Sequence, residues 1–235
     1  MSSFAALKEN CCEANRLLPS YGLVDLTFGN LSVIDRASGC FAIKPGGVAC
    51  ESLRPEDILV IDLDGNIVEG KLRPSSDMPT HRRILQAFPL ATAVVHTHSR
   101  NATAFAQAGQ AIPCFGTTHA DYFHGEVPIT RPMSRSEINA NYEWETGNII
   151  VERFQKASID PARVPAVLVR GHAPFAWGTT IGHAVENALA LEIVADLARK
   201  TLQLDPEAAP LPQSLIERHF NRKHGDGDGD CQGQS

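Results

Sequence analysis

Residues 91–98 read Ala91-Thr92-Ala93-Val94-Val95-His96-Thr97-His98. The apolar run predicts a buried β-strand that leads directly into the two histidines. Because side chains alternate faces along a strand, His96 and His98 are expected to point the same way. Two such imidazoles can present nitrogen ligands to one ion, and catalytic zinc sites usually take three protein ligands. The stretch therefore predicts a metal site that needs a further ligand from elsewhere in the chain.

Two other segments offer that ligand. His172 follows another β-rich run, in Val169-Arg170-Gly171-His172-Ala173-Pro174, and Asp77 stands in a polar loop ahead of a helix, where it is expected to be an oxygen partner. Spacing alone does not choose between His172 and the remaining histidines, and a His-x-His triplet is by itself a weak signal. The alternative interpretation is that histidines such as His81, His119, His124, His183, His219 and His224 are ordinary surface or core residues.

The rest of the chain alternates helical and extended patterns. Apolar residues spaced three or four apart predict a first helix from Phe4 to Leu18 and a long helix from Ile181 to Leu197, capped by Thr179 or Thr180. A third helix is expected from His81 to Ala87. Short β-rich runs predict strands at 26–33, 40–43, 58–62, 67–69, 91–98 and 164–169, with a hairpin turn at 64–66. Helices covering a mixed or antiparallel sheet follow from this order.

Composition narrows the class of protein. With 235 residues, 43% of them hydrophobic, one domain over 1–225 is expected, followed by a disordered acidic, glycine-rich tail over 226–235. A net charge of −6 without a basic run argues against nucleic acid as a partner. No signal peptide or membrane-spanning run is visible, which indicates no membrane association and a cytoplasmic protein. The six cysteines lack paired spacing and are interpreted as small buried hydrophobes plus one thiol in the tail.

Side by side, several segments resemble the class II aldolase and epimerase superfamily, and within it the branch of L-ribulose-5-phosphate 4-epimerases. The resemblance extends from the first helix to about Gly225. It implies a three-layer α/β/α fold with a largely antiparallel central sheet, a zinc site at Asp77, His96, His98 and His172, and a homotetramer with sites at its subunit interfaces. The segments that carry it are 26–30, 43–48, 74–77, 95–100, 116–123, 143–148 and 171–178.

The resemblance also implies the reaction. Such enzymes interconvert L-ribulose 5-phosphate and D-xylulose 5-phosphate by breaking and re-forming the C3–C4 bond, with a bound metal ion and no redox cofactor. Related aldolases have glutamate where this chain has Asp77, which favours the epimerase branch. Substrate and phosphate binding falls to Gly29, Asn30, Lys44, Gly46, Gly47, Ser75 and Ser76, although the family usually has serine at the position of Gly46.

Proton transfer requires acid–base groups on both sides of the C4 oxygen. The resemblance assigns one to Asp121, with Thr117, Glu143 and His219 in support, and implies that the C-terminal segment completes a neighbouring subunit's site. The family's second group is a tyrosine shortly after Lys223-His224-Gly225. This chain has no tyrosine there, because its tyrosines are Tyr21, Tyr122 and Tyr142.

Three questions stay open at this point. A class II aldolase that releases its fragments shares most of the chemistry, and a non-catalytic module in the manner of the adducin head domain shares the fold. Nitrogen and oxygen ligands also accept Mn²⁺ or Co²⁺ in place of Zn²⁺. The retained histidines, Asp77 and Asp121 favour the enzyme over the non-catalytic module.

Overall fold

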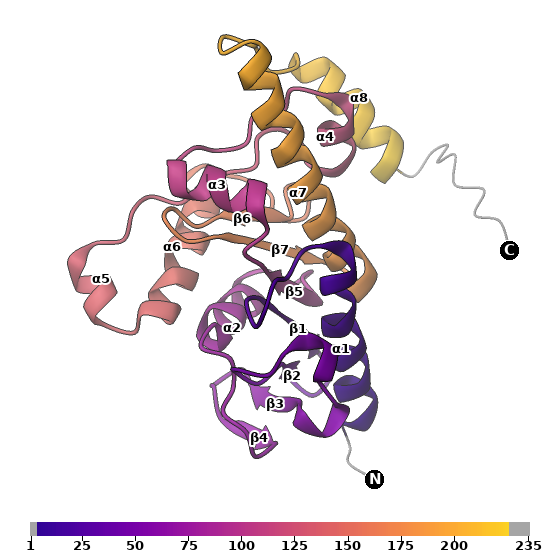
Figure 1. The fold of residues 1–235 in the computed structure, drawn as a ribbon, viewed down its shortest axis with the longest axis vertical. Helices are drawn as coiled ribbons and strands as arrows, with labels where there is room; N and C mark the ends of the chain where they lie inside the picture. Colours follow the sequence, from indigo (N-terminus) through magenta and orange to yellow (C-terminus); the bar gives the residue numbers. More distant parts are fainter. Residues whose placement is uncertain (1–3, 226–235) are drawn as a thin grey trace, which may run out of the picture.

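The computed structural model describes residues 4–225. At its centre is a seven-stranded sheet with strand order β4-β3-β2-β1-β5-β7-β6, in which every neighbouring pair is antiparallel (Figure 1). The predicted antiparallel sheet is confirmed. Its strands are β1 (Asn30–Asp35), β2 (Cys40–Ile43), β3 (Leu59–Asp62), β4 (Ile67–Glu69), β5 (Ala93–His96), β6 (Ala166–Leu168) and β7 (Pro174–Gly178).

Helices cover both faces of the sheet and complete the predicted three layers. Helices α1 (Ala5–Leu17), α3 (Arg100–Ala108) and α7 (Ile181–Leu204) contribute to one buried apolar cluster, and α2 (Met78–Ala87) and α6 (Tyr142–Lys156) contribute to a second. Strand β5 separates them, because Ala93 and Val95 belong to the first cluster and Val94 to the second. The remaining helices are α4 (Thr117–Tyr122), α5 (Arg135–Asn139) and α8 (Gln213–His224), with short 3-10 turns at Pro19–Tyr21, Cys50–Ser52 and Pro55–Asp57.

Helix α7 shows what its sequence spacing could and could not predict. Its start is confirmed, because the Thr180 hydroxyl accepts a hydrogen bond from the His183 amide at 3.1 Å. The buried side, however, consists mostly of alanines, while Ile193 and Leu197 of the predicted apolar row are 46% and 47% exposed. The buried side has small side chains because the helix lies very close to β7. At Gly178 of β7, an added Cβ would stand 2.4 Å from the Ala184 amide nitrogen.

Four predicted strands have different bounds, of which the one expected at 58–62 is shorter by a single residue, as Leu59–Asp62. The strand expected at 26–33 begins at Asn30, because residues 25–28 form a turn and Leu26 and Gly29 have positive φ angles. The strand expected at 91–98 ends at His96, where its pairing with β7 stops at Pro174, a residue without an N–H. The strand expected at 164–169 is shortened to Ala166–Leu168.

Other predictions have simple outcomes. The hairpin between β3 and β4 is confirmed, with Gly65 at φ +96°. Five cysteines are free and buried, as expected, and Cys231 lies outside the described residues together with the predicted tail 226–235. No helix among residues 4–225 has the length and apolarity needed to cross a membrane.

Candidate metal centre

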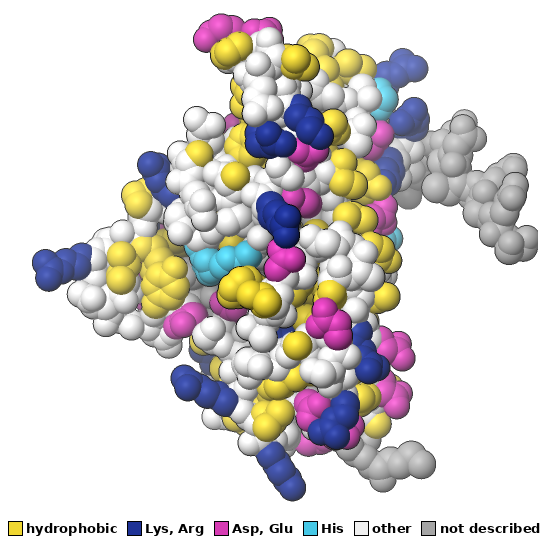
Figure 2. Space-filling model, in the orientation of Figure 1, with side chains coloured by type: hydrophobic (Ala, Val, Ile, Leu, Met, Phe, Trp, Pro, Cys, Tyr) yellow, Lys and Arg dark blue, Asp and Glu magenta, His cyan; other side chains and the backbone are white. Residues whose placement is uncertain are grey.

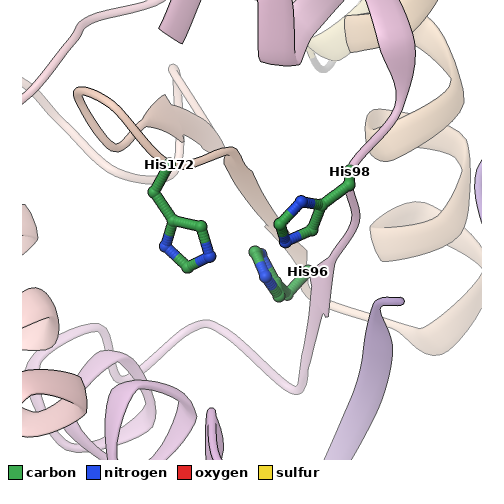
Figure 3. Close-up of side chains that lie close together, drawn as sticks. All are labelled: His96, His98 and His172. Carbon is green, nitrogen blue, oxygen red and sulfur yellow. The ribbon is translucent and has the colours of Figure 1, made fainter. Parts of the chain in front are cut away.

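His96, His98 and His172 come together at one end of strands β5 and β7. Their potential ligand nitrogens all lie within 4.8 Å of one another, and the three pairs of ring centroids are separated by 5.0 to 5.1 Å (Figure 3). His96 is buried, His172 is half-buried and His98 is exposed. Figure 2 shows histidine side chains reaching the surface beside the protruding α5 region. The structure thus brings together the three histidines that the sequence proposed.

The backbone positions two of these histidines, His96 and His172. His96 Nδ1 lies 2.9 Å from the Pro174 carbonyl oxygen and must donate to it, which leaves Nε2 with its lone pair. The same ring stacks on Phe175, with centroids 4.2 Å apart. His172 follows Gly171, whose φ of +74° permits the tight turn between β6 and β7.

Burial favours the neutral form of two of these imidazoles, those of His172 and His98. Burial, followed by the neighbouring charges of His96 and His98, lowers the pKa of His172 to about 4. Burial and then the charge of His96 also lower the pKa of His98. Neutral imidazole is the form that binds metal ions. In addition, the buried Nδ1 of His172 has no hydrogen-bond partner among the described residues, so the donor set fits a divalent ion.

Asp77 lies beside the three histidines, 4.0 Å from Oδ2 to His96 Nε2. Although it precedes α2, its side chain accepts no capping hydrogen bond from that helix. Oδ2 instead accepts from Asn30 Nδ2 at 2.7 Å and from the Ser75 hydroxyl at 3.3 Å. Burial raises the pKa of Asp77, but the charge of His96, together with His81, Asn30 and His172, outweighs burial and holds it below its usual value. The carboxylate is therefore ionised and faces the histidines.

The residues that the sequence proposed for substrate and phosphate lie on adjoining segments. Residues 44–46 pair with 73–75, because the Ser75 amide donates to the Lys44 carbonyl and the Gly46 amide donates to the Arg73 carbonyl. The Gly46 amide is thus hydrogen-bonded within the protein, and the expected role of Gly46 in phosphate binding stays a prediction. Gly47 has φ +74°, and Ser76 is exposed.

Lys44 and Asn30 are buried in this region, each 2% exposed. Lys44 Nζ donates to the Pro45 carbonyl at 3.3 Å, and burial lowers its pKa. Asn30 gives its amide hydrogens to Ser75 Oγ at 3.0 Å and to Asp77, while its Oδ1 has no partner among the described residues. Asn30 therefore acts on the carboxylate directly, in addition to any contact with substrate.

The expected acid–base residues form a separate group where α4 contacts α8. Asp121 Oδ1 lies 3.0 Å from His219 Nδ1 and 3.3 Å from the Arg222 guanidinium, and the Asp121 carbonyl contacts His224 Nε2 at 2.9 Å. Thr117 begins α4. Figure 1 shows α4 and α8 together, away from the end of β5 that carries His96. No hydrogen bond or ion pair within residues 4–225 joins Asp121 to the three histidines.

Glu143 is placed differently from the other supporting residues. It lies in the first turn of α6, where its carbonyl accepts a hydrogen bond from Thr80 of α2. The preceding residue, Tyr142, has its ring centroid 6.5 Å from that of His172. Glu143 is thus near the metal ligands, whereas Thr117, Asp121 and His219 belong to the α4–α8 group.

Sequence reasoning treated His81 as ordinary, but it supports the site. Its Nδ1 is 2.7 Å from the Ser32 hydroxyl, both residues are fully buried, and burial lowers the pKa of His81 to about 3. Ser32 lies two residues after Asn30 on β1, and His81 lies four residues after Asp77 in α2. This second link between β1 and α2 could have been predicted from two spacings. Residues two apart on a strand, such as Asn30 and Ser32, share one face, and residues four apart on a helix, such as Asp77 and His81, also share one face.

Comparison with known proteins agrees with this geometry. A family model described as the class II aldolase and adducin N-terminal domain matches residues 9–198. The chain is 48% identical over 219 residues to proteins named L-ribulose-5-phosphate 4-epimerase UlaF from Salmonella paratyphi B and Salmonella typhi, covering 93% of this chain and 95% of each relative.

Solved structures show the same fold. An L-fuculose 1-phosphate aldolase superposes with a TM-score of 0.78 at 24% identity, over 94% of this chain and 96% of the aldolase. The L-fuculose-1-phosphate aldolase of Thermus thermophilus has a TM-score of 0.67 at 26% identity, over 88% of this chain and 100% of the other. With its three-layer fold and its converging histidines, this chain belongs to the class II aldolase and adducin N-terminal domain family.

Proposed function

We propose that this protein is a zinc-dependent L-ribulose-5-phosphate 4-epimerase, an isomerase that interconverts L-ribulose 5-phosphate and D-xylulose 5-phosphate. The observation that carries the proposal is the 48% identity to curated epimerases over nearly the full length of both chains. The convergence of His96, His98 and His172 supports it, because a non-catalytic adducin-like module has no need of these ligands.

The chemistry suits a carbon that cannot be epimerised by simple deprotonation. The C4–H bond of a pentulose phosphate is not acidic, so the C3–C4 bond must break and re-form. The fragments are the enediolate of dihydroxyacetone and glycolaldehyde phosphate. When bound, a divalent cation supplies Lewis-acid stabilisation of negative charge on the substrate oxygens. His96, His98, His172 and Asp77 would hold the ion, and three nitrogens with one oxygen suit Zn²⁺, with Mn²⁺ or Co²⁺ as alternatives.

Binding of the substrate phosphate is assigned to the loops beside Asp77. Lys44 supplies a positive charge at the floor of the site, and the exposed Ser76 supplies a hydroxyl donor, with Gly29, Gly47, Ser75 and Asn30 shaping the space around them. Asn30 and Ser75 hold the Asp77 carboxylate through the hydrogen bonds described above.

Proton transfer is assigned to the Asp121–His219 pair. A carboxylate 3.0 Å from an imidazole can orient the ring and stabilise it when it carries a proton. Because both residues come from one chain, they would act together in one site. Their separation from the histidines within a chain supports a homotetramer in which the pair of one subunit meets the metal centre of the next, with Thr117 and Glu143 lining the junction. The pair supplies one proton carrier, and the sequence has no tyrosine after Lys223-His224-Gly225 to supply the family's second one.

One experiment tests metal and reaction together. Metal content is measured on purified protein, and formation of D-xylulose 5-phosphate from L-ribulose 5-phosphate is followed for the wild type and Asp121→Asn. We expect stoichiometric zinc and a loss of about 10²–10⁴-fold in rate for the variant. Glu217→Gln, on α8 but not in contact with Asp121, is the matched control.

The same assay distinguishes the competing functions. Steady release of glycolaldehyde phosphate without D-xylulose 5-phosphate would identify an aldolase. Metal-free protein from zinc-replete cells, with no turnover, would support a non-catalytic module. Full activity in Asp121→Asn would remove Asp121 from the mechanism while leaving the epimerase assignment intact.

A further inference from the structure

The turn that precedes Asn30 is attached at both ends to the segment that carries the metal ligands. Asp25 forms an ion pair with Arg100, two residues beyond His98, at 3.0 Å. At the other end, a Cβ added to Gly29 would stand 2.7 Å from the His96 carbonyl oxygen, so the two backbones are in close contact. The Phe28 amide closes the turn by donating to the Asp25 carbonyl at 3.2 Å. The position of Phe28 is therefore set by the metal-binding segment.

Two features of this turn are unfavourable for the fold alone. Leu26 has φ +56°, a left-handed conformation that leucine rarely adopts. The side chains of Leu26 and Phe28 are also 77% and 50% exposed, so they contribute little to the core. Unfavourable backbone conformations that persist in folded proteins cluster at functional sites. The result of this one is to hold an aromatic ring at the edge of the metal centre.

Phe28 lies beside the exposed member of the histidine group. Its ring centroid is 5.8 Å from that of His98, with the planes tilted by 34°. A second ring, that of Tyr142, has its centroid 6.5 Å from that of His172. Aromatic rings thus lie next to two of the three histidines, and the ring next to His98 is purely apolar.

We propose that Phe28 is a retention residue that keeps the aldehyde fragment in the site between bond cleavage and bond formation. This inference rests on the proposed epimerase function. On cleavage, the electron pair of the C3–C4 bond stays on C3, the C4 hydroxyl gives its proton to a base, and C4 becomes an aldehyde. On re-formation, C3 attacks the other face of the aldehyde and the C4 oxygen regains a proton.

An apolar ring suits this task because the aldehyde must rotate without leaving. A hydrogen-bond donor at this edge would hold the carbonyl in one orientation, whereas a phenyl face excludes water and imposes no preferred direction. The phosphate end remains the anchor of the fragment. Phe28 thereby favours re-formation of the C3–C4 bond over release of the aldehyde fragment into solvent.

The experiment measures how the intermediate is partitioned. Wild type, Phe28→Ala, Phe28→Leu and Phe28→Gln are supplied with L-ribulose 5-phosphate, and D-xylulose 5-phosphate and free glycolaldehyde phosphate are quantified in the same reaction. We expect Phe28→Ala and Phe28→Gln to raise the ratio of release to epimerisation about tenfold, the effect of losing roughly half of a phenyl contact. Phe28→Leu should stay near the wild-type ratio because it remains apolar.

Controls separate this inference from the proposed function. Leu90→Ala removes an apolar side chain that is 65% exposed at the other end of β5, and it should leave the ratio unchanged. Equal metal content in all variants shows that the ligands are intact. An unchanged ratio in both Phe28→Ala and Phe28→Gln overturns the inference even if wild type is an active epimerase. If wild type produces no D-xylulose 5-phosphate, the proposed function itself is wrong.

Discussion

Gly29 and His96 are in such close backbone contact that no side chain fits between them, since a Cβ on Gly29 would lie 2.7 Å from the His96 carbonyl oxygen and 3.2 Å from Thr97 Cα. Gly29 also has φ +82°, which favours glycine. Gly29 is thus a packing requirement of the segment that carries His96. Its presence next to Asn30 has a structural reason as well as a proposed functional one.

Gly29→Ala should therefore destabilise the protein and weaken metal binding together. The left-handed backbone and the contact with His96 predict a loss of about 2–4 kcal/mol in the free energy of unfolding. Chemical denaturation measures this loss, and metal titration measures the weakening of binding. Gly182→Ala, in the first turn of α7, where an added Cβ would make an ordinary contact of 3.9 Å with the Thr180 hydroxyl, is the control and should stabilise by up to about 1 kcal/mol. Equal stability of Gly29→Ala and wild type would contradict the close contact.

His172→Asn should uncouple metal binding from folding. Zinc that binds the folded state raises the melting temperature of wild type by mass action. Removing a ligand should weaken binding by more than the roughly 10–100-fold seen when only a supporting partner is lost. Thermal melts with and without zinc, before and after chelation, provide the readout. His183→Asn, on the exposed start of α7, should keep the wild-type zinc response. A full response in His172→Asn would exclude His172 as a ligand.

Lys44→Met should stabilise the fold of the protein while weakening its binding of substrate. The ammonium group is buried and its hydrogen bond goes to a carbonyl, so removing the charge should raise the free energy of unfolding by about 1 kcal/mol or more. Loss of a charge-assisted contact to phosphate should raise KM by about 10–100-fold. Denaturation curves and initial rates test the two effects separately. The exposed Lys71→Met is the control for both. A less stable Lys44→Met variant would show that the charge is well compensated.

His119 should make stability depend on pH. Burial lowers its pKa to about 4 in the folded state, although its Nε2 donates to the Gly125 carbonyl at 2.8 Å. Between pH 6.5 and about 4 the unfolded chain binds a proton that the folded chain does not, so stability falls as the pH falls through this window. The gap corresponds to at most about 3 kcal/mol.

Urea denaturation of wild type and His119→Gln between about pH 4 and pH 7.5 tests this dependence. The stability advantage of wild type should be largest near neutral pH and shrink on acidification. Thr118→Ala, an exposed non-titrating neighbour on α4, should show the wild-type slope. Parallel profiles for wild type and His119→Gln would mean that His119 does not contribute to the acid sensitivity.

Much of the candidate metal centre could be predicted from sequence because its residues stand at the ends of predictable elements. The apolar run before His96 predicted β5, and the polar loop before α2 singled out Asp77. The four-residue spacing in α7 predicted a helix but not its buried face, since Ile193 and Leu197 are half exposed. Close packing on Gly178 selects alanines there, and that contact exists only in the folded protein.

Other features depended on which segments meet. The short strand β7 carries a proline and a glycine and lacks a strand pattern, yet it supplies Phe175 beneath His96 and the Pro174 carbonyl that orients its ring. The pairing of Asp121 with His219, almost a hundred positions apart, likewise requires α8 to pack on α4. By itself, the sequence predicted the types of ligand and helices covering a mixed or antiparallel sheet, because these depend on local periodicity and side-chain chemistry, and the family resemblance implied the three layers. Only the tertiary structure decided which donors are engaged, which glycines are obligatory and which residues share a site, because these depend on contacts between distant segments.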